Sequence, residues 1–364
     1  MKTRGIIGNV LLLLLGVLLT VAGWFAYRIT DHDFQTALMQ RITGILSDKL
    51  GTEVHIGKTE IDFFHRVSLS DVLVLDQKKD TLLHADQLFV SLSVFKLLKN
   101  EYVIDRIVLD HPHVYMFRDR KTEEWNYQFI VDAFSSGDTT PSQNPSTVNL
   151  DLKALRLKET RFVMVDEPND TKLDFTIPLL SVDLNKLDLN QPKFDVKKLL
   201  FDRADMIIAK VPREITEEAP DTIPDTAIVH INTQPLQLFV NDLEFRDCHF
   251  MYDDMIEPAD TTAFDGMHED YHHLNMQMTD CSLVMDTIKA RIKNITLQEK
   301  SGFVVKQMEA DVKVTPTLAS ASRLKIETAH SFLQDSFSMS YQNFHAFLDF
   351  NSEVIISVLL KDSR

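Results

Sequence analysis

The stretch Leu155-Arg-Leu-Lys-Glu-Thr-Arg-Phe-Val-Met164 carries the pattern that decides the fold. Counted from Leu155, its inward-facing positions fall at 0, 2, 5, 7 and 9, with Thr160 at the fifth. Alternation with a period of two is typical of β-strands, and an odd step turns the following side chains to the other face. A bulge or tight bend at the fifth position restores the original face. The stretch therefore predicts two strand segments joined by a bend.

The same pattern recurs along the chain as an internal repeat. Further copies begin at Val67, Ile107, Leu199, Leu243 and Ile295, the last with one extra residue. Successive starts lie 40, 48, 44, 44 and 52 residues apart. Near-regular repetition of one unit is typical of elongated architectures. The chain after Gly51 is therefore predicted to be mostly β.

The N-terminal residues predict a membrane anchor. Residues 6–27 carry no formal charge, and a helix of 22 residues reaches about 33 Å, enough to cross a bilayer core. Lys2 and Arg4 precede this run, so residues 1–5 are expected in the cytoplasm and the rest on the other side. Bulky aromatic residues end the run, which favours an uncleaved anchor over a signal peptide. The anchor residues singled out are Ile6, Leu11, Leu15, Leu19, Trp24 and Tyr27.

One amphipathic helix and several loops complete the predicted organisation. Residues 34–50 have helical apolar periodicity, and Gly51 suits the position after a helix end. Short helical turns are expected near 95–98 and 127–134, and exposed loops at 135–147 and 212–226. We divide the chain into a tail (1–5), an anchor (6–27), an N-terminal region (28–134), a loop (135–147) and a repeated sheet region (148–364).

Composition excludes several classes of function. The chain has 38 Lys+Arg against 54 Asp+Glu, a net charge of −16, which argues against a nucleic-acid partner. Only 10 Gly are present, and neither a phosphate-binding Gly-rich loop nor a GxSxG nucleophile elbow occurs. Two Cys exclude a disulfide scaffold, although one Cys248–Cys281 pair stays open. We expect no catalytic residue, no metal and no cofactor.

A short histidine motif is the main exception to weigh. Residues 268–272, HEDYH, match the HExxH motif, which in zinc proteases lies on a helix with both His on one face. Here the alternating stretch 274–278 follows directly, so a loop entering a strand is favoured. A zinc hydrolase using His268, Glu269 and His272 remains a third hypothesis. His111 and His113 are interpreted as a solvated turn, and the acidic pairs 217–218 and 253–254 as solvated loop charges.

The packing of the sheet decides the function. A sheet with one apolar face must bury it against another layer, and no long amphipathic helix follows Gly51 in the sequence. The sheet can fold into a sandwich, close into a barrel, or form an open trough that holds an apolar ligand. Composition does not choose among these three.

Several segments together resemble a known family. They are the anchor, the helix ending in Lys49-Leu-Gly-Thr-Glu-Val54, and the segments 67–76, 80–85, 107–114, 125–126, 301–303, 327–331 and 338–341. Their order is similar to the N-terminal region of AsmA/TamB-like envelope proteins of the Bacteroidetes type. The large C-terminal domain of TamB-like proteins has no room in 364 residues, so the resemblance implies a fragment or a short relative.

The resemblance implies a fold and a function. The fold is an elongated, curled antiparallel β-sheet with an apolar interior, anchored in the inner membrane and extending through the periplasm. The implied function is shielding of phospholipid acyl chains on their way to the outer membrane. The alternative is assembly of outer-membrane β-barrel proteins, so phospholipids and an outer-membrane or other envelope protein are the expected partners. The expected groove lining is Ile107, Leu109, Val114, Met116, Leu155, Leu157, Phe162, Met164, Phe201, Met206, Leu243, Phe245, Phe250, Ile295 and Leu297.

Overall fold

The computed structural model describes most of the chain after residue 50. The described ranges are 51–62, 66–92, 102–135, 148–188, 193–212, 237–260, 265–342 and 354–361, with residue 363 and six single positions between 40 and 50. The predicted anchor (6–27), the turn near 95–98 and most of the helix 34–50 and of the two predicted loops lie outside these residues. Within them, no helix has the length and apolar character needed to cross a membrane.

The described residues form one large β-sheet of 16 strands with almost no helix. The helix α4 (Gln128–Ser135) confirms the turn predicted at 127–134. The strands are β1 (Val54–Asp62), β2 (Arg66–Leu75), β3 (Thr81–Leu92), β4 (Tyr102–Asp110), β5 (His113–Arg118), β6 (Val148–Asp166), β7 (Thr171–Asp188), β8 (Lys193–Asp202), β9 (Asp205–Lys210), β10 (Gln237–Asp254), β11 (His268–Val284), β12 (Thr287–Glu299), β13 (Val304–Thr315), β14 (Leu318–Thr328), β15 (Phe332–Ser340) and β16 (Ile355–Leu360).

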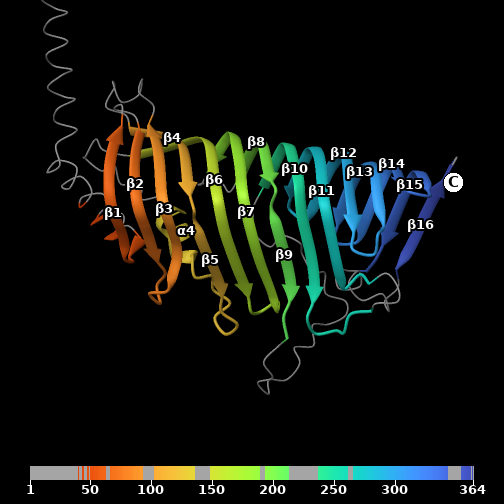
Figure 1. Cartoon of the computed structure of the whole chain (residues 1–364), viewed down its shortest axis with the longest axis horizontal. Helices are drawn as coiled ribbons and strands as arrows, with labels where there is room; N and C mark the ends of the chain where they lie inside the picture. The colour runs from red at the N-terminus through yellow and green to blue at the C-terminus, as the bar shows by residue number, and fades with distance from the viewer. Residues whose placement is uncertain are drawn as a thin grey trace, which may run out of the picture.

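The strands succeed one another along the long axis of the molecule, from β1 at one end to β16 at the other (Figure 1). Fourteen strand positions follow in sequence order, because β4 and β5 share one position and β8 and β9 another. Thirteen spacings of ~4.8 Å give a sheet about 62 Å long. The sheet runs without a break past the loop predicted at 135–147, since β4 pairs with β6.

The sheet is mixed, so the prediction of a purely antiparallel sheet is wrong. β4 and β5 both pair with β6 in parallel, and β8 and β9 both pair with β10 in parallel. Parallel neighbours need a long crossover, whereas antiparallel neighbours need only a hairpin. The connections 119–147 and 211–236 supply that length in this chain.

The predicted repeat corresponds to strands that all run in one direction and lie in register. The repeat copies occupy β2, β4 with β5, β6, β8 with β9, and β10, and antiparallel strands β3 and β7 fill two of the intervals. Ile107 pairs directly with Leu155, and Leu199 with Leu243. The first residue of each of these five copies therefore falls in one row across the sheet.

The predicted bend is present in all five of these copies. The residue at position four of each copy has a positive φ between 46° and 54°. These residues are Asp71, His111, Glu159, Arg203 and Asp247. One residue in the left-handed region is what a bulge needs to absorb an odd step. The side chains that follow are buried: Val72, Pro112, Thr160, Ala204 and Cys248.

The sixth copy has a different structure. Leu297 and Val305 pair with each other across β12 and β13, and Gly302 adopts a φ of 91° between them. The extra residue in this copy therefore belongs to a hairpin turn. The match at Ile295 is two strands joined by a turn, not one bent strand as the pattern predicted.

Candidate functional site

One face of the sheet is apolar along its length, and we call it the apolar face. Directly paired residues on neighbouring strands stand on the same face, so the register identifies its members. Before the bends the rows are Val67, Val90, Ile107, Leu155, Val182, Leu199, Leu243 and Met278, then Leu69, Leu88, Leu109, Leu157, Leu180, Phe201, Phe245 and Met276. Beyond the bends the rows are Leu83, Val114, Phe162, Phe175, Met206, Phe250 and Tyr271, then Met116, Met164, Leu173, Ile208 and Tyr252.

All fifteen residues predicted as lining lie on this face. Thirteen of them fall within the four rows, and Ile295 pairs with Met276 at the next strand, with Leu297 two residues beyond. Only Met206 is buried, at 6% exposure; the other fourteen are partly exposed. Large side chains pack laterally, as in the Phe201–Phe245 stack with ring centroids 4.7 Å apart. The face is therefore continuous, and among the described residues no second sheet covers it. At its N-terminal end the helical residue Leu50 packs against the cluster of Val54, Ile56, Leu69 and Val72.

The antiparallel strands supply residues of the apolar face that the repeat pattern did not identify. Val182, Leu180 and Phe175 of β7 stand between the copies of β6 and β8. Toward the C-terminal end, the apolar cluster around Ile292 includes Met308, Val312, Ile326 and Phe337. The alternation of apolar and polar residues along these strands was the available signal. It does not share the repeat spacing, and β7 runs opposite to the strands that carry the repeat.

The opposite face is polar and carries cross-strand ion pairs. Arg156 and Asp183 lie 2.5 Å apart, and Lys198 and Glu244 lie 2.8 Å apart. Hydrogen bonds from Arg246 and Lys198 lower the pKa of Glu244. Opposite charges on paired strands stabilise the register between them. The sheet is therefore amphipathic, with its two faces sorted by strand alternation.

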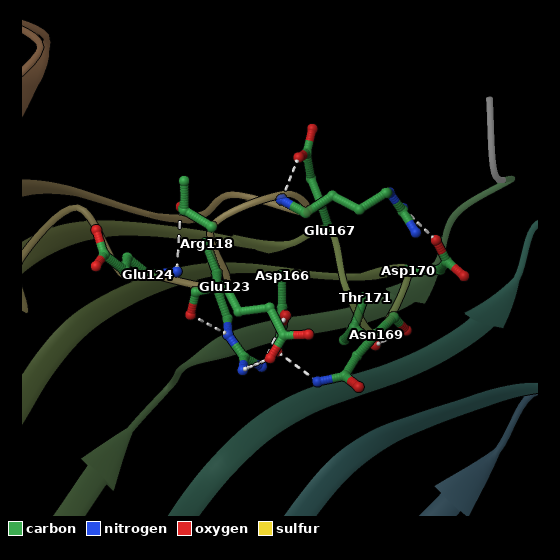
Figure 2. A network of polar contacts seen from close by, with 10 residues as sticks. Arg118, Glu123, Glu124, Asp166, Glu167, Asn169, Asp170 and Thr171 are labelled. Carbon is green, nitrogen blue, oxygen red and sulfur yellow. Dashed lines mark hydrogen bonds and ion pairs between the residues drawn. The ribbon is translucent and has the colours of Figure 1, made fainter. Parts of the chain in front are cut away.

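Charged residues border the apolar face where β5, β6, β9 and β10 end. Arg118 and Asp166 pair across β5 and β6 at 3.5 Å, and Lys210 and Asp254 across β9 and β10 at 3.4 Å. Figure 2 shows Arg118 held between Asp166 and the backbone of Glu123. Asp254 is only 1% exposed. The interpretation of residue 254 as a solvated loop charge is therefore wrong, because Lys210 and a turn amide at Ile256 hold it inside the strand end.

These charged residues also cap the turns that follow the strands. Asn169 donates a hydrogen bond to Asp166 at 2.7 Å (Figure 2). Arg120 and Asp170 lie 2.5 Å apart. Asp76 accepts hydrogen bonds from the amides of Lys78 and Asp80. Such donors satisfy the buried carboxylate of Asp76, whereas Asp166 Oδ1 accepts no hydrogen bond and has only the ion pair with Arg118. The apolar face thus ends at an ordered polar rim.

The HExxH segment lies wholly on a strand, so the prediction of a loop that enters a strand is wrong for residues 268–272. His268 and His272 both belong to β11, and four residues of strand separate them by about 13 Å. Glu269 and Tyr271 pair with Tyr252 and Phe250 on the apolar face, opposite to both His. Burial there raises the pKa of Glu269. The geometry of a helical zinc protease is therefore not formed.

Part of this motif meets a histidine of the neighbouring strand instead. His249 of β10 contacts Asp270 of β11 through Nε2 at 2.8 Å and Asp205 of β9 through Nδ1 at 2.7 Å. His272 Nε2 lies 3.1 Å from the same Asp270 oxygen, and its ring stacks on that of His249 at 4.6 Å. One ligand atom from each of His249, Asp270 and His272 lies within 4.8 Å of the others, close enough to hold a metal ion.

The remaining sequence candidates have ordinary surroundings. His111 is exposed and contacts Asp110 at 2.9 Å, which agrees with a solvated turn. Cys248 and Cys281 are both free thiols, so the open question of a disulfide is answered in the negative. Residues 217–218 lie outside the described part of the chain.

Comparisons with known proteins identify no family for this chain. No protein-family model matches it, and no curated protein matches it. The resemblance to AsmA/TamB-like proteins therefore rests on the sequence segments alone.

Proposed function

We propose that this chain is an envelope protein of the AsmA/TamB-like type that shields phospholipid acyl chains in transit between two membranes. In this proposal residues 6–27 anchor it in the inner membrane, with the N-terminus cytoplasmic and the sheet in the periplasm. The observation that carries the proposal is the continuous apolar face, with partly exposed large side chains and no second sheet over it among the described residues. No catalytic residue is required.

The aligned bends support a trough with the apolar face inside. Bulges bend a strand and increase its twist, so bulges in register across several strands bend the whole sheet along one line. The side chains on that line are deeply buried, and three of them are small: Ala204 and Cys248 are each 1% exposed, and Ala85 is fully buried. Small buried residues fit the inside of a bend, where space is least. We therefore infer that the sheet curls around its apolar face.

A trough of this kind lowers the free-energy cost of moving a phospholipid through water. Exposing about 30 methylenes of a phospholipid to water costs on the order of 24 kcal/mol at ~0.8 kcal/mol each. Met and Phe side chains along the rows beyond the bends, such as Phe162, Met164 and Phe250, adapt to acyl chains of different shape. The polar rim at Arg118 and Asp166 offers charged neighbours for headgroups. The proposed function requires only that apolar side chains line the trough without gaps.

Lipid mass spectrometry on the full chain, extracted in mild detergent, tests the proposal. We expect about one or more phospholipids per wild-type chain, and a loss of at least about fivefold for Phe162→Asp and Phe250→Asp. A charge on this face must be desolvated by any acyl chain that covers it. The matched control is Ser181→Asp, which places the same charge on the polar face beside Arg156.

The result has two clear readings. Lipid lost from both Phe variants and retained by Ser181→Asp supports an acyl-chain site on the apolar face. Equal lipid in all four proteins, or none in the wild type, contradicts it. Far-UV circular dichroism of each variant verifies that the sheet is intact.

A second candidate function is favoured by the sheet edge at β16. All six residues of β16 are exposed and none is charged, and the strand is the last in the sheet among the described residues. An uncovered apolar edge is a template for strand addition. An assembly factor for outer-membrane β-barrel proteins would use this edge. Binding of an unfolded β-barrel protein by lipid-free chain, abolished by lysines in β16, would favour this function over lipid shielding.

A further inference from the structure

Three neighbouring strands bring a pair of histidines and two carboxylates together on the polar face. His249 is on β10, Asp205 faces it from β9, and Asp270 and His272 follow on β11. The two ring Nε2 atoms converge on one oxygen of Asp270, at 2.8 and 3.1 Å. The two imidazole rings are nearly parallel, with an interplanar angle of 7°. The three groups therefore hold two nitrogen atoms and one oxygen atom within 4.8 Å of one another.

The spacing of these atoms is close to that of a metal coordination shell. Zinc binds His nitrogen and carboxylate oxygen at about 2.0–2.2 Å, so tetrahedral ligand atoms lie about 3.3–3.5 Å apart. The Nε2–oxygen separations here need to widen by only about half an ångström. The half-exposed ring of His272 must also turn out of its stack on His249, because the lone pairs of parallel imidazoles do not point at a common centre. Side-chain exposures of 30% for His249 and 49% for His272 leave the point open to solvent. An ion can thus enter without unfolding the sheet.

The second nitrogen of His249 has the partner that a metal ligand requires. Metal-bound histidines commonly donate their other N–H to a carboxylate, which fixes the tautomer and the ring orientation. His249 Nδ1 lies 2.7 Å from Asp205 Oδ1, so Nδ1–H donates to Asp205. An ion that replaces the Nε2 proton, which donates to Asp270, makes Nε2 the ligand atom. Asp205 and Asp270 together also offset the charge of a divalent cation.

We propose that His249, Asp270 and His272 bind one divalent transition-metal ion of the zinc class, with Asp205 orienting His249. Two imidazoles and one carboxylate suit Zn²⁺ and its first-row neighbours better than Mg²⁺ or Ca²⁺, which prefer oxygen ligands. Three protein ligands leave one position for water. The site is on the opposite face from the proposed lipid site and does not depend on it.

The position of the site indicates a structural role. The β10–β11 register shifts on both sides of Cys248, directly beside His249, and His273 of β11 has a φ of 51°. β9 and β10 are parallel, so their connection through residues 211–236 does not clamp them as a hairpin would. A metal ion held by β10 and β11, with β9 tied through Asp205, stabilises the register at this irregular point.

Zinc binding by the full chain in detergent tests the proposal. After treatment with a chelator, the protein is titrated with Zn²⁺ alone, and bound metal is measured by equilibrium dialysis and elemental analysis. We expect one tight site per chain, weakened at least about 100-fold in His249→Gln and His272→Gln. Asp205→Asn is expected to weaken it about 10–100-fold through loss of the orienting carboxylate. His273→Gln, which removes the exposed histidine next to the site, is the matched control.

Thermal unfolding supplies a readout that separates binding from folding. Zinc should raise the unfolding temperature of the wild type and of His273→Gln, and not that of His272→Gln, since a ligand stabilises only the state that binds it. His272 is half exposed, so its substitution should leave the metal-free stability unchanged. Absence of tight binding by the wild type, or equal binding by His249→Gln and His272→Gln, would overturn the proposal.

Discussion

At the scale of single residues, the two cysteines show how burial in the sheet raises the pKa of a thiol. Cys248 occupies the bend of its repeat copy and is 1% exposed, with its Sγ 3.4 Å from the carbonyl of Arg246. Burial raises the pKa of Cys248, and burial together with Asp280 and Asp242 raises the pKa of Cys281 to about 11. Both thiols are therefore held in the unreactive protonated form.

Thiol reactivity tests this description directly. At pH 8 about one Cys281 in a thousand is a thiolate, and the thiolate is the reacting form. We expect the folded chain to react with a disulfide reagent at least about 100-fold more slowly than the same chain in urea. Intact mass under non-reducing conditions should show no loss of two hydrogens. Rapid modification of the folded chain, or a disulfide in it, would contradict the structure.

Single residues also mark the limit of what the sequence predicts. All fifteen lining residues fell on one face because alternation and the bend position together determine the face within a strand. The group of His249, Asp270 and His272 was not predicted, because it depends on which residues of two strands lie opposite each other. Only Asp270 and His272 stood in a motif, and that motif suggested the wrong partner. Asp254 was misjudged for the same reason, since its neighbour Lys210 lies 44 residues away in the chain.

At the scale of the element, the aligned bends are the feature that shapes the sheet. Five residues that are not glycine hold a positive φ at equivalent positions. The left-handed region costs an ordinary residue roughly 1–2 kcal/mol, and glycine is spared this cost. The bends are therefore strained positions whose conformation the paired strands on both sides maintain.

A pair of substitutions at one bend measures that strain. Glu159 of β6 is exposed and has a φ of 48°. Glu159→Gly should leave the free energy of unfolding unchanged or raise it by up to about 1 kcal/mol, because relief of strain offsets the greater freedom of the unfolded chain. Glu159→Val should lower it by about 1–2 kcal/mol, since β-branched residues resist positive φ. Urea unfolding of both variants gives the values, and a Gly variant less stable than the Val variant would contradict the bend.

The direction of neighbouring strands is the element-level property that spacing alone did not reveal. The interval from Leu155 to Leu199 and the interval from Leu199 to Leu243 are both 44 residues. The first contains the full antiparallel strand β7, whereas the second contains β9 and a long connection and leads to a parallel pair. Equal lengths thus encode different topologies. The repeat predicted the strands and their bends, and the pairing direction followed only from the structure.

At the scale of the whole molecule, the sheet has two faces of opposite character and ends that differ in exposure. The apolar face runs from β1 to the cluster of Met339 and Tyr341 beside the C-terminal strands. β16 continues it with Ile356 and Val358, which pair with Met339 and Phe337. Ile355 and Leu359 of the same strand lie on the polar side, opposite Ser340 and Ser336, and are 68% and 52% exposed. Apolar residues on both faces of an edge strand are unusual for a protected edge.

We therefore expect β16 to be the site through which the sheet associates with another strand, including the edge of a second copy. Sedimentation velocity of the full chain in detergent should show larger species as its concentration rises. Ile355→Lys with Leu359→Lys should suppress them, because charges on an edge strand oppose strand addition. The lipid content should not change, since both positions lie off the apolar face.

Val131→Lys on α4, an equally hydrophobic exposed site at 44%, is the matched control. Association that is absent in the wild type, or that persists in the double variant while the control is unaffected, would show that β16 is not the contact. Suppression confined to the double variant would identify the edge as the place where the apolar face can be extended by a further strand.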